Sequence, residues 1–218
     1  MWVGVFQDDI LCGVKTAATW LACGAFAALP AAAAGVDATV RDASGAALED
    51  AVVWAMPKAP GASRPRREAA IEQVNKQFVP LVTVVQVGTQ VRFPNRDEIR
   101  HHVYSFSPPK PFEIKLYAGT PADPVLFDKP GLVVLGCNIH DQMLAYVYVV
   151  ETPFFGKAGK DGRVRIEGLP AGDYELHAWH HAQAAQPGPQ PLKLRGDETT
   201  PAAFQVATRA VPGRPAAK

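Results

Sequence analysis

The chain has 218 residues, of which 48% are hydrophobic, and its formal net charge is +1 at neutral pH. This length allows one sizeable domain or two small ones, and the apolar content is sufficient for a core. The small net charge and the absence of a long basic run argue against nucleic acid as a partner.

The N-terminal segment has the layout of a secretory signal. Lys15 precedes the apolar run 16–29, and a stretch of four alanines then ends at Ala34. A basic start, a short apolar run and a small-residue exit predict cleavage after Ala34, so that residues 1–34 form a signal peptide. The apolar run is too short for a permanent anchor, and we expect a periplasmic mature chain without a transmembrane segment.

Cleavage at this position would leave Cys137 as the single cysteine, because Cys12 and Cys23 lie within the signal. A single cysteine cannot form a disulfide within the chain. Unpaired thiols are uncommon in an oxidising compartment unless a metal or another group occupies them. A lone cysteine is in general more often an inert core residue, so the residues around Cys137 decide between the two interpretations.

The remainder of the sequence has the pattern of an all-β protein. Short apolar and β-branched runs are separated by Gly, Pro, Asn and Asp, and helical periodicity is almost absent. We expect strands at 36–41, 51–56, 70–74, 81–87, 90–94, 102–107, 113–117, 125–127, 132–137, 144–151, 163–166 and 174–179. The continuous apolar runs 132–135 and 147–150 predict strands buried on both faces. The Pro-rich stretch 57–68 is expected to be an exposed linker, and 207–218 a disordered tail.

Three potential metal ligands lie close together between the predicted strands 132–137 and 144–151. They are Cys137, His140 and Met143. A thiolate, an imidazole and a thioether suit copper that changes between Cu(I) and Cu(II), because imidazole supports Cu(II) and sulfur stabilises Cu(I). A thiol, an imidazole and a thioether in one loop therefore favour a copper site over an inert cysteine.

Such a copper site needs a second imidazole, which His101 or His102 could supply. Successive residues of a strand point to opposite faces, so only one of these two histidines can face the metal. Zinc is the rival ion for a Cys-His-His set, although methionine is an unusual zinc ligand. His177, His180 and His181 are not expected to form a second metal site, because His177 and His180 would face opposite sides of a strand.

Residues 69–152 resemble the cupredoxins, the blue-copper family. The C-x2-H-x2-M spacing of Cys137, His140 and Met143 is similar to the ligand loop of amicyanin, and Asp97 followed by His101 resembles the family's D-x-x-x-H segment. The stretches HHVYSFS and GCNIHD are similar to those of cupredoxin-like methylamine utilization proteins. The resemblance implies a Greek-key β-sandwich and one copper ion bound by His101, Cys137, His140 and, weakly, Met143.

Two positions depart from the cupredoxin pattern. The family commonly has Asn directly after the first ligand histidine, where it braces the cysteine loop, and this chain has His102 there. The alignment favours His101 over His102 as the ligand. Asp141 and Gln142 make the ligand loop more polar than in relatives with an apolar loop, which would change the preferred partner.

The flanking segments resemble a second family. Residues 161–180 are similar to the later strands of carboxypeptidase-regulatory or transthyretin-like sandwiches, and 36–53 to their early strands. One interpretation is a discontinuous sandwich, 35–57 plus 156–206, into which the cupredoxin domain is inserted. The alternative is that the flanking strands extend the sheets of one enlarged cupredoxin.

The resemblance implies a type 1 copper protein that carries single electrons in the periplasm. Cys137, His101 and His140 would hold the ion, Met143 would be the axial ligand, and His140 would face the partner. The expected partner is a redox protein such as a c-type cytochrome or a dehydrogenase. We expect a monomer that is not an enzyme. The alternatives are a copper protein for delivery, storage or sensing, and a surface interaction module with a structural metal.

Overall fold

The computed structural model describes residues 34–59, 68–121 and 123–209. All regular structure among these residues is β-strand, so the predicted all-β class is confirmed. The described part of the chain contains no helix that could cross a lipid bilayer. The strands are β1 (Ala34–Asp42), β2 (Val52–Pro57), β3 (Glu68–Ala70), β4 (Glu72–Val74), β5 (Gln77–Val79), β6 (Val82–Gln86), β7 (Thr89–Arg92), β8 (His101–Ser105), β9 (Phe112–Tyr117), β10 (Val125–Phe127), β11 (Gly131–Gly136), β12 (Leu144–Val150), β13 (Phe155–Lys157), β14 (Arg163–Leu169), β15 (Gly172–Trp179), β16 (Gln190–Leu194) and β17 (Thr199–Val206).

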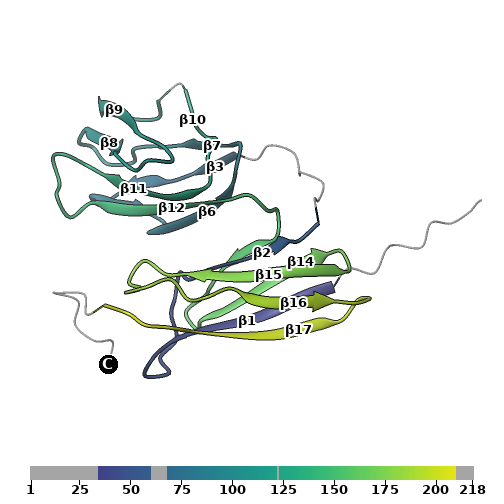
Figure 1. Ribbon diagram of the computed structural model, residues 1–218. Helices are drawn as coiled ribbons and strands as arrows, with labels where there is room; N and C mark the ends of the chain where they lie inside the picture. Colours follow the sequence, from purple (N-terminus) through teal and green to yellow (C-terminus); the bar gives the residue numbers. More distant parts are fainter. Residues whose placement is uncertain (1–33, 60–67, 122, 210–218) are drawn as a thin grey trace, which may run out of the picture. The chain divides into compact units, whose positions relative to one another are not determined.

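Two sheets from the two ends of the chain form what we call the outer sandwich (Figure 1). Their strand orders are β14-β1-β17 and β13-β2-β15-β16. Alternation along β14 places Val164 and Ile166 in the core, while Arg163 and Arg165 are exposed. β1 is antiparallel to β14 and parallel to β17, so the first and last strands are neighbours. The buried side chains of both sheets form one hydrophobic cluster.

Strands β3 to β12 form what we call the central sandwich. Its larger sheet has the order β6-β12-β11-β8-β9, and a smaller sheet has the order β10-β7-β3. The cluster of buried residues includes Phe93, Phe127 and Leu135, together with Cys137 and Met143 from the predicted ligand loop. The central sandwich therefore has a core of its own, distinct from that of the outer sandwich, and the predicted ligands lie at its edge.

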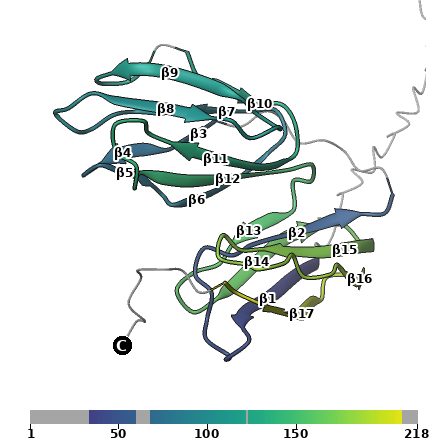
Figure 2. The ribbon, with the colours of Figure 1, turned by 60° about the vertical axis from the view of Figure 1, so that its left-hand side comes forward.

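A short hairpin, β4–β5, accompanies these sheets (Figure 2). Its two turn residues, Asn75 and Lys76, have φ angles of 53° and 58°. A two-residue hairpin loop with positive φ at both positions is the type I′ arrangement, whose twist matches that of the paired strands. This turn matters for the site because its backbone N–H groups bind Asp97, as described below.

A third cluster contains aromatic residues of both sandwiches. Trp54 and Trp179 come from the outer sandwich, and Tyr146 and Tyr148 from β12. The ring centroid of Tyr148 lies 4.9 Å from that of Trp54 and 5.1 Å from that of Trp179. These contacts explain why the sequence of β12 is apolar on both faces. Its alternate residues pack into the central core and against the outer strands.

The ends of the predicted segments differ in detail from the structure. Of the predicted signal 1–34, only Ala34 lies within the described residues, where it is buried and begins β1. Residues 207–209, expected in the tail, form backbone hydrogen bonds with residues 182–184. The predicted strand 70–74 is two strands, β3 and β4, in different sheets.

Candidate metal centre

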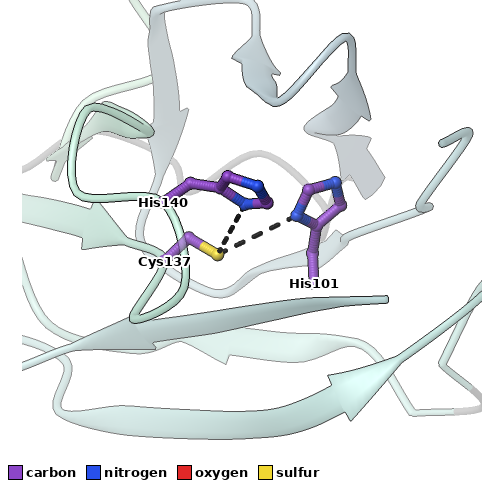
Figure 3. Close-up of side chains that lie close together, drawn as sticks. All are labelled: His101, Cys137 and His140. Carbon is purple, nitrogen blue, oxygen red and sulfur yellow. Dashed lines mark hydrogen bonds between the residues drawn. The ribbon is translucent and has the colours of Figure 1, made fainter. Parts of the chain in front are cut away.

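Three of the four predicted ligands come together at one end of the central sandwich (Figure 3). The Sγ atom of Cys137 lies 3.9 Å from Nδ1 of His101 and 4.0 Å from Nδ1 of His140. The possible ligand atoms of these three residues all lie within 4.8 Å of one another. Cys137 and His101 are buried, whereas His140 is partly exposed. The structure thus forms a small pocket of one sulfur and two nitrogens with one ligand facing outward.

The loop between β11 and β12 supplies Cys137 and His140. The two strands are paired up to Gly136 and Leu144, so the loop spans only residues 137–143. Within it, the backbone N–H of His140 donates to the carbonyl of Cys137, and that of Met143 donates to the carbonyl of His140. These consecutive turns keep the loop compact and direct both side chains toward His101, which begins the neighbouring strand β8.

Met143 is buried in the same cluster as Cys137. It closes the ligand loop directly before β12, where alternation places it on the side of Ala145 and Val147, which also belong to the core. This burial gives the thioether an apolar environment next to the loop. The assignment of Met143 as the axial ligand remains a prediction.

Asp97 fixes the tautomer of His101. Its Oδ2 atom lies 2.7 Å from Nε2 of His101. An ionised carboxylate can only accept hydrogen bonds, so it accepts from the Nε2–H of His101, and Nδ1 is the ring nitrogen that faces Cys137. Carboxylate–histidine pairs of this kind orient metal-binding imidazoles and make them better ligands. Asp97 therefore holds the His101 ring with Nδ1 toward Cys137, the nitrogen that could bind a metal.

The same carboxylate is held by the β4–β5 turn. The backbone N–H groups of Asn75 and Lys76 donate to its two oxygens over 2.7 and 2.9 Å. Burial by itself raises the pKa of Asp97, but the hydrogen bonds from Lys76, His101 and Asn75 outweigh it and lower the pKa below the usual value. Asp97 therefore stays ionised and ties the hairpin to the ligand histidine.

A second polar group positions the segment that leads to His101. The side-chain amide of Asn95 donates to the carbonyls of Ile99 and Tyr117, and its oxygen accepts the N–H of Asp97. Asn95 is buried, and all of its side-chain atoms have partners. It therefore holds the chain on both sides of Asp97 in one conformation.

Tyr117 and Gln73 fill the space behind the site. The Tyr117 hydroxyl donates to the carbonyl of Phe93 and accepts a hydrogen bond from the Gln73 side chain. Burial raises the pKa of Tyr117 to about 12, and the negative charge of Cys137 acts in the same direction, whereas the bond from Gln73 lowers it. Tyr117 thus remains protonated and directs its proton to the carbonyl of Phe93.

His102 faces the other side of β8. Its Nε2 atom lies 3.0 Å from a carboxylate oxygen of Glu113 on β9, although the contact lacks the direction of a hydrogen bond. The alternation expected from the sequence therefore separates the two histidines, with His101 in the Cys-His-His group and His102 outside it. Asp97 and Asn95 are the polar side chains that fix the segment leading to His101.

The geometry of the three donors fits a metal ion. Bonds of about 2.0 Å to nitrogen and 2.3 Å to sulfur, at about 120° to one another, place the sulfur about 3.7 Å from each nitrogen. The observed separations of 3.9 and 4.0 Å match that spacing. One thiolate and two imidazoles with a thioether nearby is the donor set that suits copper best.

Among the comparisons with known proteins, only the search of solved structures gives matches. No family model matches the chain, and no characterised protein matches its sequence. Solved structures that match part of the chain include a cupredoxin and a copper-containing nitrite reductase. A purple cupredoxin from Nitrosopumilus maritimus is 22% identical, covers 38% of this chain and 99% of its own length, and has a TM-score of 0.34.

Two further solved structures match about the same share of the chain. A copper-containing nitrite reductase from Thermus scotoductus is 29% identical over 44% of this chain and 26% of its own, with a TM-score of 0.37. A variant of amicyanin is 19% identical over 37% of this chain and 80% of its own, with a TM-score of 0.34. Support for a metal site comes from the Cys-His-His arrangement itself.

The other histidines of the chain have structural contacts. The ring of His177 stacks on Trp54, with centroids 5.1 Å apart. Nε2 of His180 lies 3.0 Å from the carbonyl oxygen of Glu49.

The sequence patterns alone assign no role to Asp97, Asn95 or Tyr117. An acidic residue four positions before the ligand histidine was the one visible signal for Asp97, whereas the contacts of Asn95 and Tyr117 depend on the fold.

Proposed function

We propose that this protein is a type 1 copper protein that carries single electrons between redox partners in the periplasm. The observation that carries the proposal is the convergence of Cys137, His101 and His140, of which the first two are buried and His140 is partly exposed. Copper held there would supply one-electron chemistry through its Cu(I) and Cu(II) states. The partners we propose are redox proteins such as a c-type cytochrome or a dehydrogenase, and the protein itself is not an enzyme.

Each residue has a distinct part in this function. Cys137 provides the thiolate, and His101 and His140 complete a trigonal set, with Met143 as the weak axial ligand that tunes the potential. His101 is locked by Asp97, so the donor set needs little rearrangement when the oxidation state changes. His140 is the partly exposed member of the set, whereas His101 and Cys137 are buried.

Addition of Cu(II) to the metal-free protein tests the proposal. The expected result is an intense visible absorption band from thiolate charge transfer and an EPR spectrum of a single copper ion, both lost in Cys137→Ser. Reversible one-electron voltammetry of the same sample separates electron transfer from copper storage. A wild type that stays colourless with bound Cu(I), or a spectrum that Cys137→Ser leaves unchanged, would overturn the proposal in favour of a delivery or structural site.

A further inference from the structure

A groove beside the candidate metal centre has apolar walls. It has a volume of about 600 Å³ and lies on the side of β8 that faces away from His101. Its lining includes Tyr104, Phe106, Pro111, Phe112, Glu113 and Asn138. The groove has no part in the metal pocket described above. We call it the aromatic groove.

Phe106 stands at the rim of this groove and is 85% exposed. Its ring centroid lies 5.0 Å from that of Tyr104, so the two rings form a continuous apolar surface. Single exposed apolar residues are common on proteins, but an exposed aromatic ring next to an apolar groove is typical of an interaction surface. Ile139, the exposed apolar residue beside His140, is 45% exposed and does not line the groove.

The aromatic groove is joined to the candidate metal centre through Gly136. Tyr104 pairs with Gly136 across the sheet, and its ring lies over that glycine, since a Cβ atom there would be 2.8 Å from Cζ of Tyr104. The next residue is Cys137, and Asn138 after it lines the groove. A partner seated in the groove would therefore approach the thiolate side of the centre, away from the His140 edge.

The charge of the groove indicates the chemistry of its occupant. Glu113 is the one acidic residue in the lining; its side chain is 52% exposed, and one carboxylate oxygen lies 3.0 Å from Nε2 of His102, which also lines the groove. The nearby Lys110 is paired with Asp128 at 3.3 Å. An apolar groove with an acidic rim is complementary to an apolar side chain flanked by lysine or arginine.

We propose that the aromatic groove is a docking site for a basic redox protein, which inserts an apolar side chain beside Phe106 and places a basic residue against Glu113. The inference rests on the proposed function only in that the partner is a redox protein. The acidic rim steers the partner and the two rings supply the buried contact area, because aromatic residues at the centre of an interface carry much of its affinity.

Binding of a basic c-type cytochrome to the metal-free, isotope-labelled chain tests the proposal by NMR at low ionic strength. The expected chemical-shift changes centre on residues 104–106 and 111–113. Phe106→Ala should raise the Kd about tenfold, because it removes one aromatic side chain from the centre of the contact. Glu113→Gln should weaken the dependence of binding on salt. Ile139→Ala is the matched control, an exposed apolar residue outside the groove, and should leave the Kd unchanged.

Shift changes centred on residues 138–144, with weaker binding in Ile139→Ala and unchanged binding in Phe106→Ala, would overturn the proposal. Absence of saturable binding at low salt would overturn it equally. The thermal unfolding midpoint of Phe106→Ala should equal that of the wild type, which shows that weaker binding of this variant is not caused by unfolding. These measurements use the metal-free chain, so a negative result refutes the docking proposal alone. The copper proposal is refuted by a different result, the absence of a visible band that depends on Cys137.

Discussion

Replacement of Asp97 by Asn should raise the reduction potential of the copper-loaded protein. The carboxylate lies 2.7 Å from Nε2 of His101 and is negatively charged, which favours the more positive oxidation state of an ion bound to that ring. The Asp97→Asn variant keeps the size of the side chain but removes this charge. The lower oxidation state then gains in relative stability, and the potential moves upward.

The size of the shift follows from the geometry. An ion bound at Nδ1 of His101 would lie about 6.5 Å from the Asp97 carboxylate, given a metal–nitrogen bond of about 2 Å. Two unit charges at this distance interact by about 2.6 kcal/mol at an effective dielectric constant of about 20, or about 110 mV for one electron. Because the Asp97 side chain is 14% exposed, solvent screens part of this interaction, and we expect a rise of about 50–100 mV.

Voltammetry of the copper-loaded wild type, Asp97→Asn and Glu98→Gln measures the effect. Glu98 is an exposed acid next to Asp97 in sequence, so Glu98→Gln makes the same change in net charge without touching His101. The control should move the potential much less, since exposed charges are strongly screened. A shift in Asp97→Asn that is no larger than in Glu98→Gln, or one of opposite sign, would refute the account of Asp97 as the group that acts on His101.

Three further predictions concern the surroundings of the centre. His101→Ala should abolish the visible copper band while His102→Ala keeps it, as absorption spectra of the two copper-loaded variants will show; equal loss in both would contradict the assignment. Gly136→Ala should lower the free energy of unfolding by about 1–3 kcal/mol in urea titrations, because its Cβ must displace the ring of Tyr104, and a neutral result would contradict that packing. The raised pKa of Tyr117, about 12, means that the unfolded chain loses this proton first as the pH rises above 10. Wild-type stability should therefore fall between pH 10 and 12, and Tyr117→Phe should reduce that fall in urea titrations of the metal-free protein; parallel curves would contradict it.

The sequence was informative where a local pattern determines the structure. Alternation at His101 and His102 predicts that one histidine faces the site, and the structure brings His101 to Cys137 and His140. The short spacing of Cys137 and His140 likewise predicts that one loop holds both side chains. These inferences succeed because strand periodicity and loop length act over a few residues.

Other features depend on contacts between distant segments. Asp97 accepts hydrogen bonds from the backbone N–H groups of a turn more than 20 residues earlier, and no local sequence pattern predicts this contact. Strand β5 is short and adjoins Pro80, and β16 contains Pro191, so neither has a clear strand pattern. The apolar run at 147–150 predicts a strand buried on both faces, but only the fold identifies Trp54 and Trp179 as the residues that cover its second side.

The pairing of β1 with β17 affects the order in which the two sandwiches fold. Residues 34–42 find their parallel neighbour only in residues 199–206, near the opposite end of the chain. Contacts between such distant segments form late, because a long intervening loop must be closed first. The central sandwich, by contrast, is assembled from a continuous stretch, 68–150. During folding the central sandwich can therefore complete its core before β1 pairs with β17, and loss of β17 would destabilise the outer sandwich before the central one.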